Sequence, residues 1–108
     1  MIALVAGLAG ACADQSFCAK KQQCNDKLND DDQAVCVAQA DRNINMLRAN
    51  SESECQDLAN AELDLESCAS SLSCSDFNDP KLGGNCDDQR AKVTDASDAA
   101  GNLCDETH

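Results

Sequence analysis

The stretch CAKKQQCNDKLNDDDQAVC, residues 18–36, decides the fold, because a later stretch repeats its cysteine spacing. That later stretch is CASSLSCSDFNDPKLGGNC, residues 68–86, in which three cysteines again leave gaps of five and eleven residues. A fourth cysteine follows each set, Cys55 after 18 residues and Cys104 after 17. The spacing predicts a duplication with a period of 50 residues, in repeat units of about 18–55 and 68–104.

The first unit has the pattern of a helical hairpin. Apolar residues at helical spacing predict a helix over residues 14–28. The run Asn29-Asp30-Asp31-Asp32 forms a turn that also caps a second helix, since carboxylates favour the positive end of a helix dipole. That second helix is expected to continue to about Asn50.

The second unit repeats the hairpin. Ser51 and Glu54 have the spacing of a capping box at the start of a third helix. Asn85, together with Asp87 and Asp88, is expected to cap a fourth helix, which ends near Gly101. No run has the alternation of a strand. The fold class is therefore predicted to be all-α, a disulfide-stapled helical bundle of two tandem cysteine-repeat helical hairpins.

The composition explains why disulfides are needed. The chain of 108 residues has nine cysteines, but only two aromatic residues and few large aliphatic ones. So thin a core barely offsets the entropy lost on folding, and small exported domains make up the difference with disulfides. No Cys-x-x-Cys pair is present, and the one histidine is His108. Disulfides are therefore favoured over a metal site, no cofactor is expected, and an extracytoplasmic location is predicted.

Helix geometry suggests how eight cysteines pair. Cys55 and Cys104 arrive at the same level of two antiparallel helices, and Cys74 and Cys86 flank the turn between them. The preferred arrangement adds a turn bond in the first unit and one bond between the units. The rival arrangement keeps the two turn bonds. The preferred pairs are Cys55–Cys104, Cys74–Cys86, Cys24–Cys36 and Cys18–Cys68, and the rival replaces two of them with Cys18–Cys55 and Cys68–Cys104.

Residues 1–12 are predicted to be a signal segment, followed by one cysteine-rich helical domain over residues 13–108. Residues 2–11 form an uncharged apolar run. With the small residues that follow, Leu8-Ala9-Gly10-Ala11-Cys12 resembles a bacterial lipoprotein export signal, although such signals usually carry leucine where Ala9 stands. The resemblance covers only residues 1–12 and implies lipidation of Cys12, which would leave an even set of eight cysteines.

Two other interpretations of this segment stay open. Ala9-Gly10-Ala11 or Ala11-Cys12-Ala13 has the form of an ordinary signal-peptidase site, which would give a freely secreted protein. The segment could also be retained as a hydrophobic first helix. Both the lipoprotein signal and the ordinary signal peptide imply export to the periplasm, the outer envelope or the extracellular space.

A non-catalytic interaction or structural module is the predicted function. With 8 basic and 20 acidic residues the net charge is −12, which disfavours binding to nucleic acid, and a membrane would be reached only through a lipid on Cys12. No nucleophile and base stand in a catalytic pattern, so an enzyme is not expected. The partner is a protein or small ligand of unknown identity. The alternatives are a freely secreted signalling protein, an inhibitor or a small-ligand carrier.

Weak calcium binding is the remote alternative. Asp76, Asn78 and Asp87 partly follow the spacing of an EF-hand loop, but Pro80 and Lys81 interrupt the pattern where that loop needs a ligand and a glycine. The acidic residues of 26–32 are a second weak candidate. Capping and solubility are the favoured explanation of both groups, so no metal site is predicted.

Overall fold

The computed structural model describes residues 2–105, and their side chains from Cys12 onward. The described chain is helical and contains no strand. Four long helices and two short ones follow each other in the order α1 Ile2–Gln23, α2 Asp30–Ala49, α3 Ser53–Ser70, α4 Cys74–Phe77, η1 Leu82–Gly84 and α5 Asp87–Ala100. The all-α, disulfide-stapled bundle expected from the sequence is confirmed.

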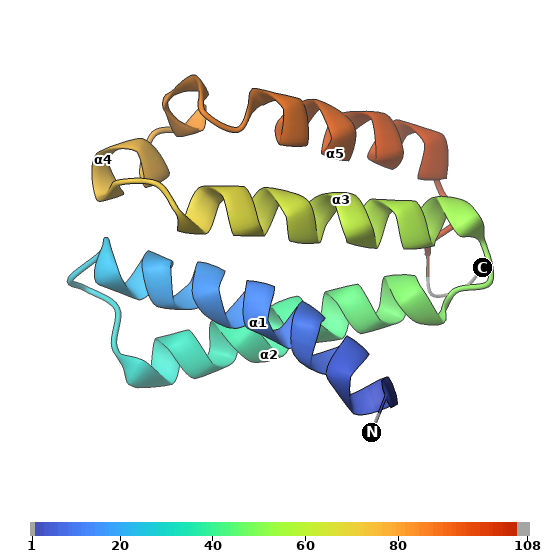
Figure 1. Cartoon of the computed structure of the whole chain (residues 1–108), viewed down its shortest axis with the longest axis horizontal. Helices are drawn as coiled ribbons and strands as arrows, with labels where there is room; N and C mark the ends of the chain where they lie inside the picture. The colour runs from blue at the N-terminus through green and yellow to red at the C-terminus, as the bar shows by residue number, and fades with distance from the viewer. Residues whose placement is uncertain (1, 106–108) are drawn as a thin grey trace.

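The four long helices form two antiparallel hairpins, α1 with α2 and α3 with α5 (Figure 1). Helix α3 lies in the middle of the bundle, between α5 on one side and the α1–α2 pair on the other. Because neighbours cover α3 on several sides, its buried residues do not keep to one stripe. They are Cys55, Ala59, Ala61, Leu63 and Ala69.

The apolar core is small and lies at one end of the bundle. Ile44 and Leu47 of α2 pack against Cys55, Ala59 and Leu63 of α3. Ala13, Leu58, Leu103 and Cys104 add partly buried apolar surface around this cluster. A core of so few large side chains stabilises the fold weakly, so the disulfides carry much of the stability.

The turn before α2 has the cap that the sequence predicts. The Asn29 side chain accepts a hydrogen bond from the Asp32 backbone N–H at 2.9 Å, and the Asp32 carboxylate accepts one from the Asn29 N–H at 3.0 Å. Together they form a capping box, and acidic residues fill the first turn of α2. The first helix, however, ends at Gln23, five residues before the predicted end at Leu28.

The predicted starts of the third and fourth helices are wrong in detail. Ser51 does not cap α3, because the turn is built on Asn50, whose side chain accepts from the Glu52 N–H at 2.9 Å. Asn85 does not cap α5, because its side chain is used inside the preceding loop. Cys86 takes the N-cap position without a side-chain hydrogen bond. The predicted stop at Gly101 is confirmed, with a φ of +50°.

Candidate functional site

Four disulfides use eight of the nine cysteines. Cys18–Cys36 ties α1 to α2, and Cys68–Cys86 ties the end of α3 to the start of α5. Cys55–Cys104 joins the start of α3 to the segment after α5. Cys24–Cys74 connects the first hairpin to the second. Four intrachain disulfides indicate an oxidising, extracytoplasmic compartment.

The preferred pairing is right for Cys55–Cys104 and wrong for the other three bonds, Cys24–Cys36, Cys74–Cys86 and Cys18–Cys68. The rival bonds Cys18–Cys55 and Cys68–Cys104 are wrong as well. For Cys18 and Cys24 the cause is the early end of α1 at Gln23. Cys24 therefore stands beyond the helix at the tip of the hairpin, where it can reach the next hairpin. Cys18 and Cys36 lie at similar distances from the turn, so they face each other along the antiparallel helices.

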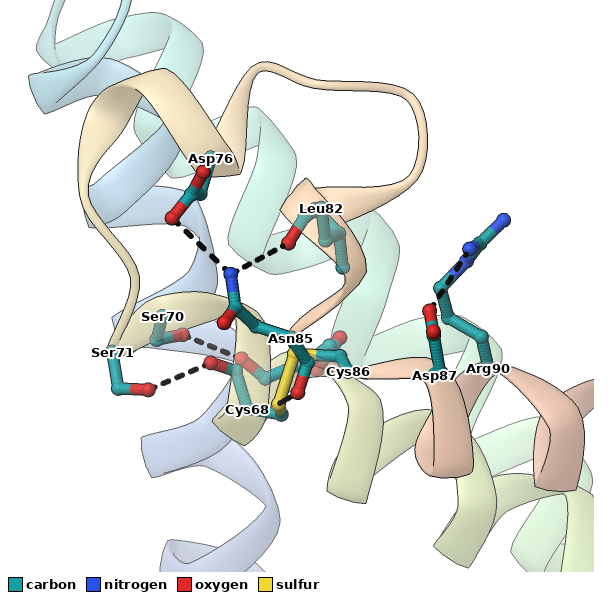
Figure 2. Close-up of a disulfide and its surroundings, with 10 residues drawn as sticks. Cys68, Ser70, Ser71, Asp76, Leu82, Asn85, Cys86, Asp87 and Arg90 are labelled. Carbon is teal, nitrogen blue, oxygen red and sulfur yellow. Dashed lines mark hydrogen bonds and ion pairs between the residues drawn. A yellow bond between two sulfur atoms is a disulfide. The ribbon is translucent and has the colours of Figure 1, made fainter.

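The loop next to Cys68–Cys86 is organised by polar side chains (Figure 2). The Asn85 amide donates to the Asp76 carboxylate at 3.2 Å and to the Leu82 carbonyl at 3.1 Å. Gly83 has a φ of +64°, and a Cβ there would collide with the Asp76 carboxylate. The loop therefore depends on glycine at this position and on a carboxylate opposite it.

The weak calcium candidates make other contacts, Asp76 and Asn78 from this loop and Asp87 within the first turn of α5. Asp76 accepts from Asn85, the Asn78 amide donates to the Cys24 carbonyl at 3.1 Å, and Asp87 lies 3.7 Å from Arg90. Among the residues that the structure describes, no group of three or more His, Cys, Asp or Glu side chains is placed to hold a metal ion. His108 lies outside the described residues.

Cys12 is the free cysteine, and it is exposed. It lies on α1, six residues before the first disulfide at Cys18. Residues 2–11, the apolar part of the predicted signal segment, belong to the same helix, but their side chains lie outside the described part, as does Met1. Within residues 2–105, no helix is long and apolar enough to cross a bilayer.

Asp14 is a buried carboxylate without a partner. It is 1% exposed, and neither of its oxygens receives a hydrogen bond. It faces Glu66 of α3 and Asp41 of α2, each within hydrogen-bonding range of it once a proton is present. One oxygen of Glu66 is likewise buried and unpartnered. We call Asp14, Asp41 and Glu66 the carboxyl cluster. Three neighbouring carboxyl groups with so few donors cannot all be ionised cheaply.

The electrostatics follow from this burial. Burial raises the pKa of Asp14 from 3.8 to about 6, and the hydrogen bond that protonated Asp14 donates to Glu66 adds to the rise. The bond with Asp41, in which Asp14 accepts, and the charge of Arg48 on α2 oppose it. The hydrogen bond with Asp14 raises the pKa of Asp41 to about 6, and burial contributes as well. Burial also raises the pKa of Glu66. Nearby on α3, burial raises the pKa of Glu62, which accepts from the Asn43 amide at 3.0 Å.

The sequence predicts Asp14 only as the start of the helix over residues 14–28, and the carboxyl cluster was not predicted. A signal was present in α3. Glu66 lies seven residues after Ala59 and three before Ala69, both of them buried, and so occupies the same helix face. Charged residues are rarely buried unless they are paired, so this spacing singles out Glu66 but does not identify its partners on α1 and α2.

A groove lies between α1 and α2. Its volume is about 800 Å³. It is lined by Ala19 of α1 and Ala34, Val37 and Ala38 of α2, with Asp30 and Asp41 among its polar residues. This groove is where a small ligand would be sought.

The chain matches no protein-family model, no curated protein and no solved structure.

Proposed function

We propose that this chain is an exported, non-catalytic interaction module that a lipid on Cys12 displays on a bacterial envelope. One observation carries the proposal: eight cysteines are bonded inside the fold, and Cys12 alone is free and exposed. The Cys12 thiol has no partner among the cysteines that form the four disulfides. The apolar segment before it resembles an export signal, which gives the thiol a use as an acyl acceptor.

A rigid body of stapled hairpins suits binding more than catalysis. Because disulfides hold the backbone in place without a large core, the exposed residues are not needed for stability and can be selected for contact with a partner. The net charge of −12 favours a cationic protein surface over nucleic acid or an anionic bilayer.

The test is expression of the full chain in a bacterium, with fractionation and intact mass of the product. Lipidation predicts a membrane-associated protein that begins at Cys12 and carries acyl groups. The matched control is Cys12→Ser, which should lose the acyl mass and keep all four disulfides. A soluble product without acyl groups that begins at Cys12 or Asp14 would instead select free secretion, as a signalling protein or inhibitor, and would overturn the anchor.

A small-ligand carrier is the second candidate, and the groove between α1 and α2 favours it. Native mass spectrometry of protein from its natural source would detect a co-purifying ligand. Val37→Asp would place a charge in the groove and should release that ligand, whereas Val35→Asp changes an exposed residue of the same helix and serves as control. Protein that carries no ligand removes this candidate.

A further inference from the structure

The start of α1 is held differently from the rest of the bundle. Its later part is bonded through Cys18 to α2 and is followed directly by Cys24, which is bonded to the second hairpin. Residues 12–17 precede both bonds. Among their described contacts with the core, Ala13 packs against the apolar cluster and Asp14 enters the carboxyl cluster. Docking of this segment therefore depends on non-covalent contacts.

Phe17 of this segment also lies against Phe77 of α4, with ring centroids 5.5 Å apart. Among the contacts of residues 12–17, those of Asp14 are the ones that depend on protonation. As a carboxylate Asp14 is buried without a donor and faces two other acidic side chains. With a proton it donates a hydrogen bond to one of them, and the repulsion between the helices falls. The surrounding groups are Asp41 and Arg48 on α2 and Glu62 and Glu66 on α3, so one cation faces four carboxyl groups including Asp14 itself.

We propose that the carboxyl cluster is a proton-operated latch: in acid it docks residues 12–17 of α1 onto α2 and α3, and it releases them as the pH rises towards neutral. The two disulfides that follow confine the movement to this segment. The segment carries Cys12, so the latch would control how closely any group attached there is held to the body. The inference itself rests on the cluster and not on the proposed lipid.

A proton fits this cluster better than a metal ion. Nowhere in the described residues are three acidic, histidine or cysteine side chains arranged as metal ligands. A proton needs only two carboxyl groups within hydrogen-bonding range, and Asp14 has this relation with both Asp41 and Glu66.

Hydrogen–deuterium exchange of the full chain tests the latch. Rates corrected for the intrinsic effect of pH are compared at about pH 4.5 and about pH 7.5. Because the pKa of Asp14 moves from 3.8 to about 6, we expect the protection of residues 12–17 to fall by about 10- to 100-fold at the higher pH. Protection in the middle of α3 should change far less.

Variants complete the test. Asp14→Asn mimics the protonated group and should keep residues 12–17 protected at both pH values. Asp41→Asn, at a less buried position, should reduce the pH-dependent change in protection of residues 12–17 by at least about half. This variant covers the case in which Asp14→Asn does not fold. The matched control is Asp64→Asn, an exposed acid of α3, which should behave as wild type.

Three results would overturn the latch. The first is protection of residues 12–17 that does not depend on pH in the wild-type chain. The second is an equal loss of protection in α3, which would mean that the whole fold loosens. The third is restoration of protection at about pH 7.5 by millimolar calcium, which would make the cluster a cation site instead.

Discussion

Cys24 and Cys74 occupy the same place in their two cysteine sets and are bonded to each other, with their Cα atoms 5.1 Å apart. Cys55 and Cys104, the last cysteines of the two sets, are bonded in the same way. Cys18–Cys36 and Cys68–Cys86 are counterparts, each spanning 18 residues. The bond pattern is thus unchanged when the two sets are exchanged, as in a two-fold arrangement. The duplication itself stays a prediction, and this pattern supports it.

Loss of the Cys24–Cys74 disulfide should cost more stability than loss of the Cys68–Cys86 disulfide. The Cys24–Cys74 bond closes 50 residues and is the disulfide that joins the α1–α2 hairpin to the α3–α5 hairpin. Replacing both cysteines with serine should lower the free energy of unfolding by about 4 kcal/mol in the loop-entropy account. The Cys68–Cys86 bond closes only 18 residues, so replacing both of its cysteines with serine should cost about 3 kcal/mol. Urea unfolding measures both, and a larger loss at Cys68–Cys86 would contradict this ranking.

The pairing shows where sequence reasoning ends. The spacing of the cysteines predicts the duplication, and the antiparallel rise of two helices is enough for Cys55–Cys104. Cys18–Cys36 and Cys24–Cys74 depend on where α1 ends, and Cys68–Cys86 depends on where α3 ends; no glycine or proline lies near Gln23 or Ser70 to mark these ends. A helix that ends a few residues early changes which cysteine faces which. Boundaries of this kind are set by tertiary packing and by the disulfides themselves, so propensity alone cannot locate them.

The carboxyl cluster was beyond the sequence for a different reason. Asp14, Asp41 and Glu66 stand on three helices, and only the packing of those helices brings them together. Each has the helical spacing of a buried neighbour, but solvated acids share such spacings by chance. By contrast, Asn29 is recognisable locally, because its partner Asp32 is three residues away.

The Asn29 cap should contribute measurably to stability. Asn29→Ala removes the acceptor for the Asp32 N–H and should cost about 1 kcal/mol. Asn45→Ala is the matched control, since Asn45 is exposed in the interior of the same helix, where alanine is a better helix former. In thermal unfolding, the midpoint of Asn29→Ala should therefore fall, whereas that of Asn45→Ala should rise or stay unchanged. An equal loss in both would show that the capping box contributes nothing.

Gly83 should tolerate alanine poorly. Its φ is +64°, and the added Cβ would meet the Asp76 carboxylate, which already accepts from Asn85. We expect Gly83→Ala to cost about 2 kcal/mol, part of it from the backbone and part from the displaced carboxylate. At Gly84 the φ is +77° and the nearest atom is 3.9 Å from the added Cβ, so Gly84→Ala should cost only the backbone part, about 1 kcal/mol. Denaturant midpoints of the two variants decide, and equal values would exclude the contact with Asp76.

Stability should fall, not rise, between acid and neutral pH. The folded-state pKa of Asp14 is raised from 3.8 to about 6, so its favourable contribution is complete below 3.8 and is lost as the pH rises through about 6. A shift of about two pKa units amounts to at most about 3 kcal/mol, and opening of the latch would reduce the loss seen in global unfolding. Urea midpoints at about pH 4.5 and about pH 7.5 measure it. Asp14→Asn should flatten the profile, and Asp64→Asn should leave it as in wild type. A wild-type profile that falls no more steeply than that of Asp14→Asn contradicts the assignment, because a raised pKa of Asp14 requires its contribution to be lost over this pH range.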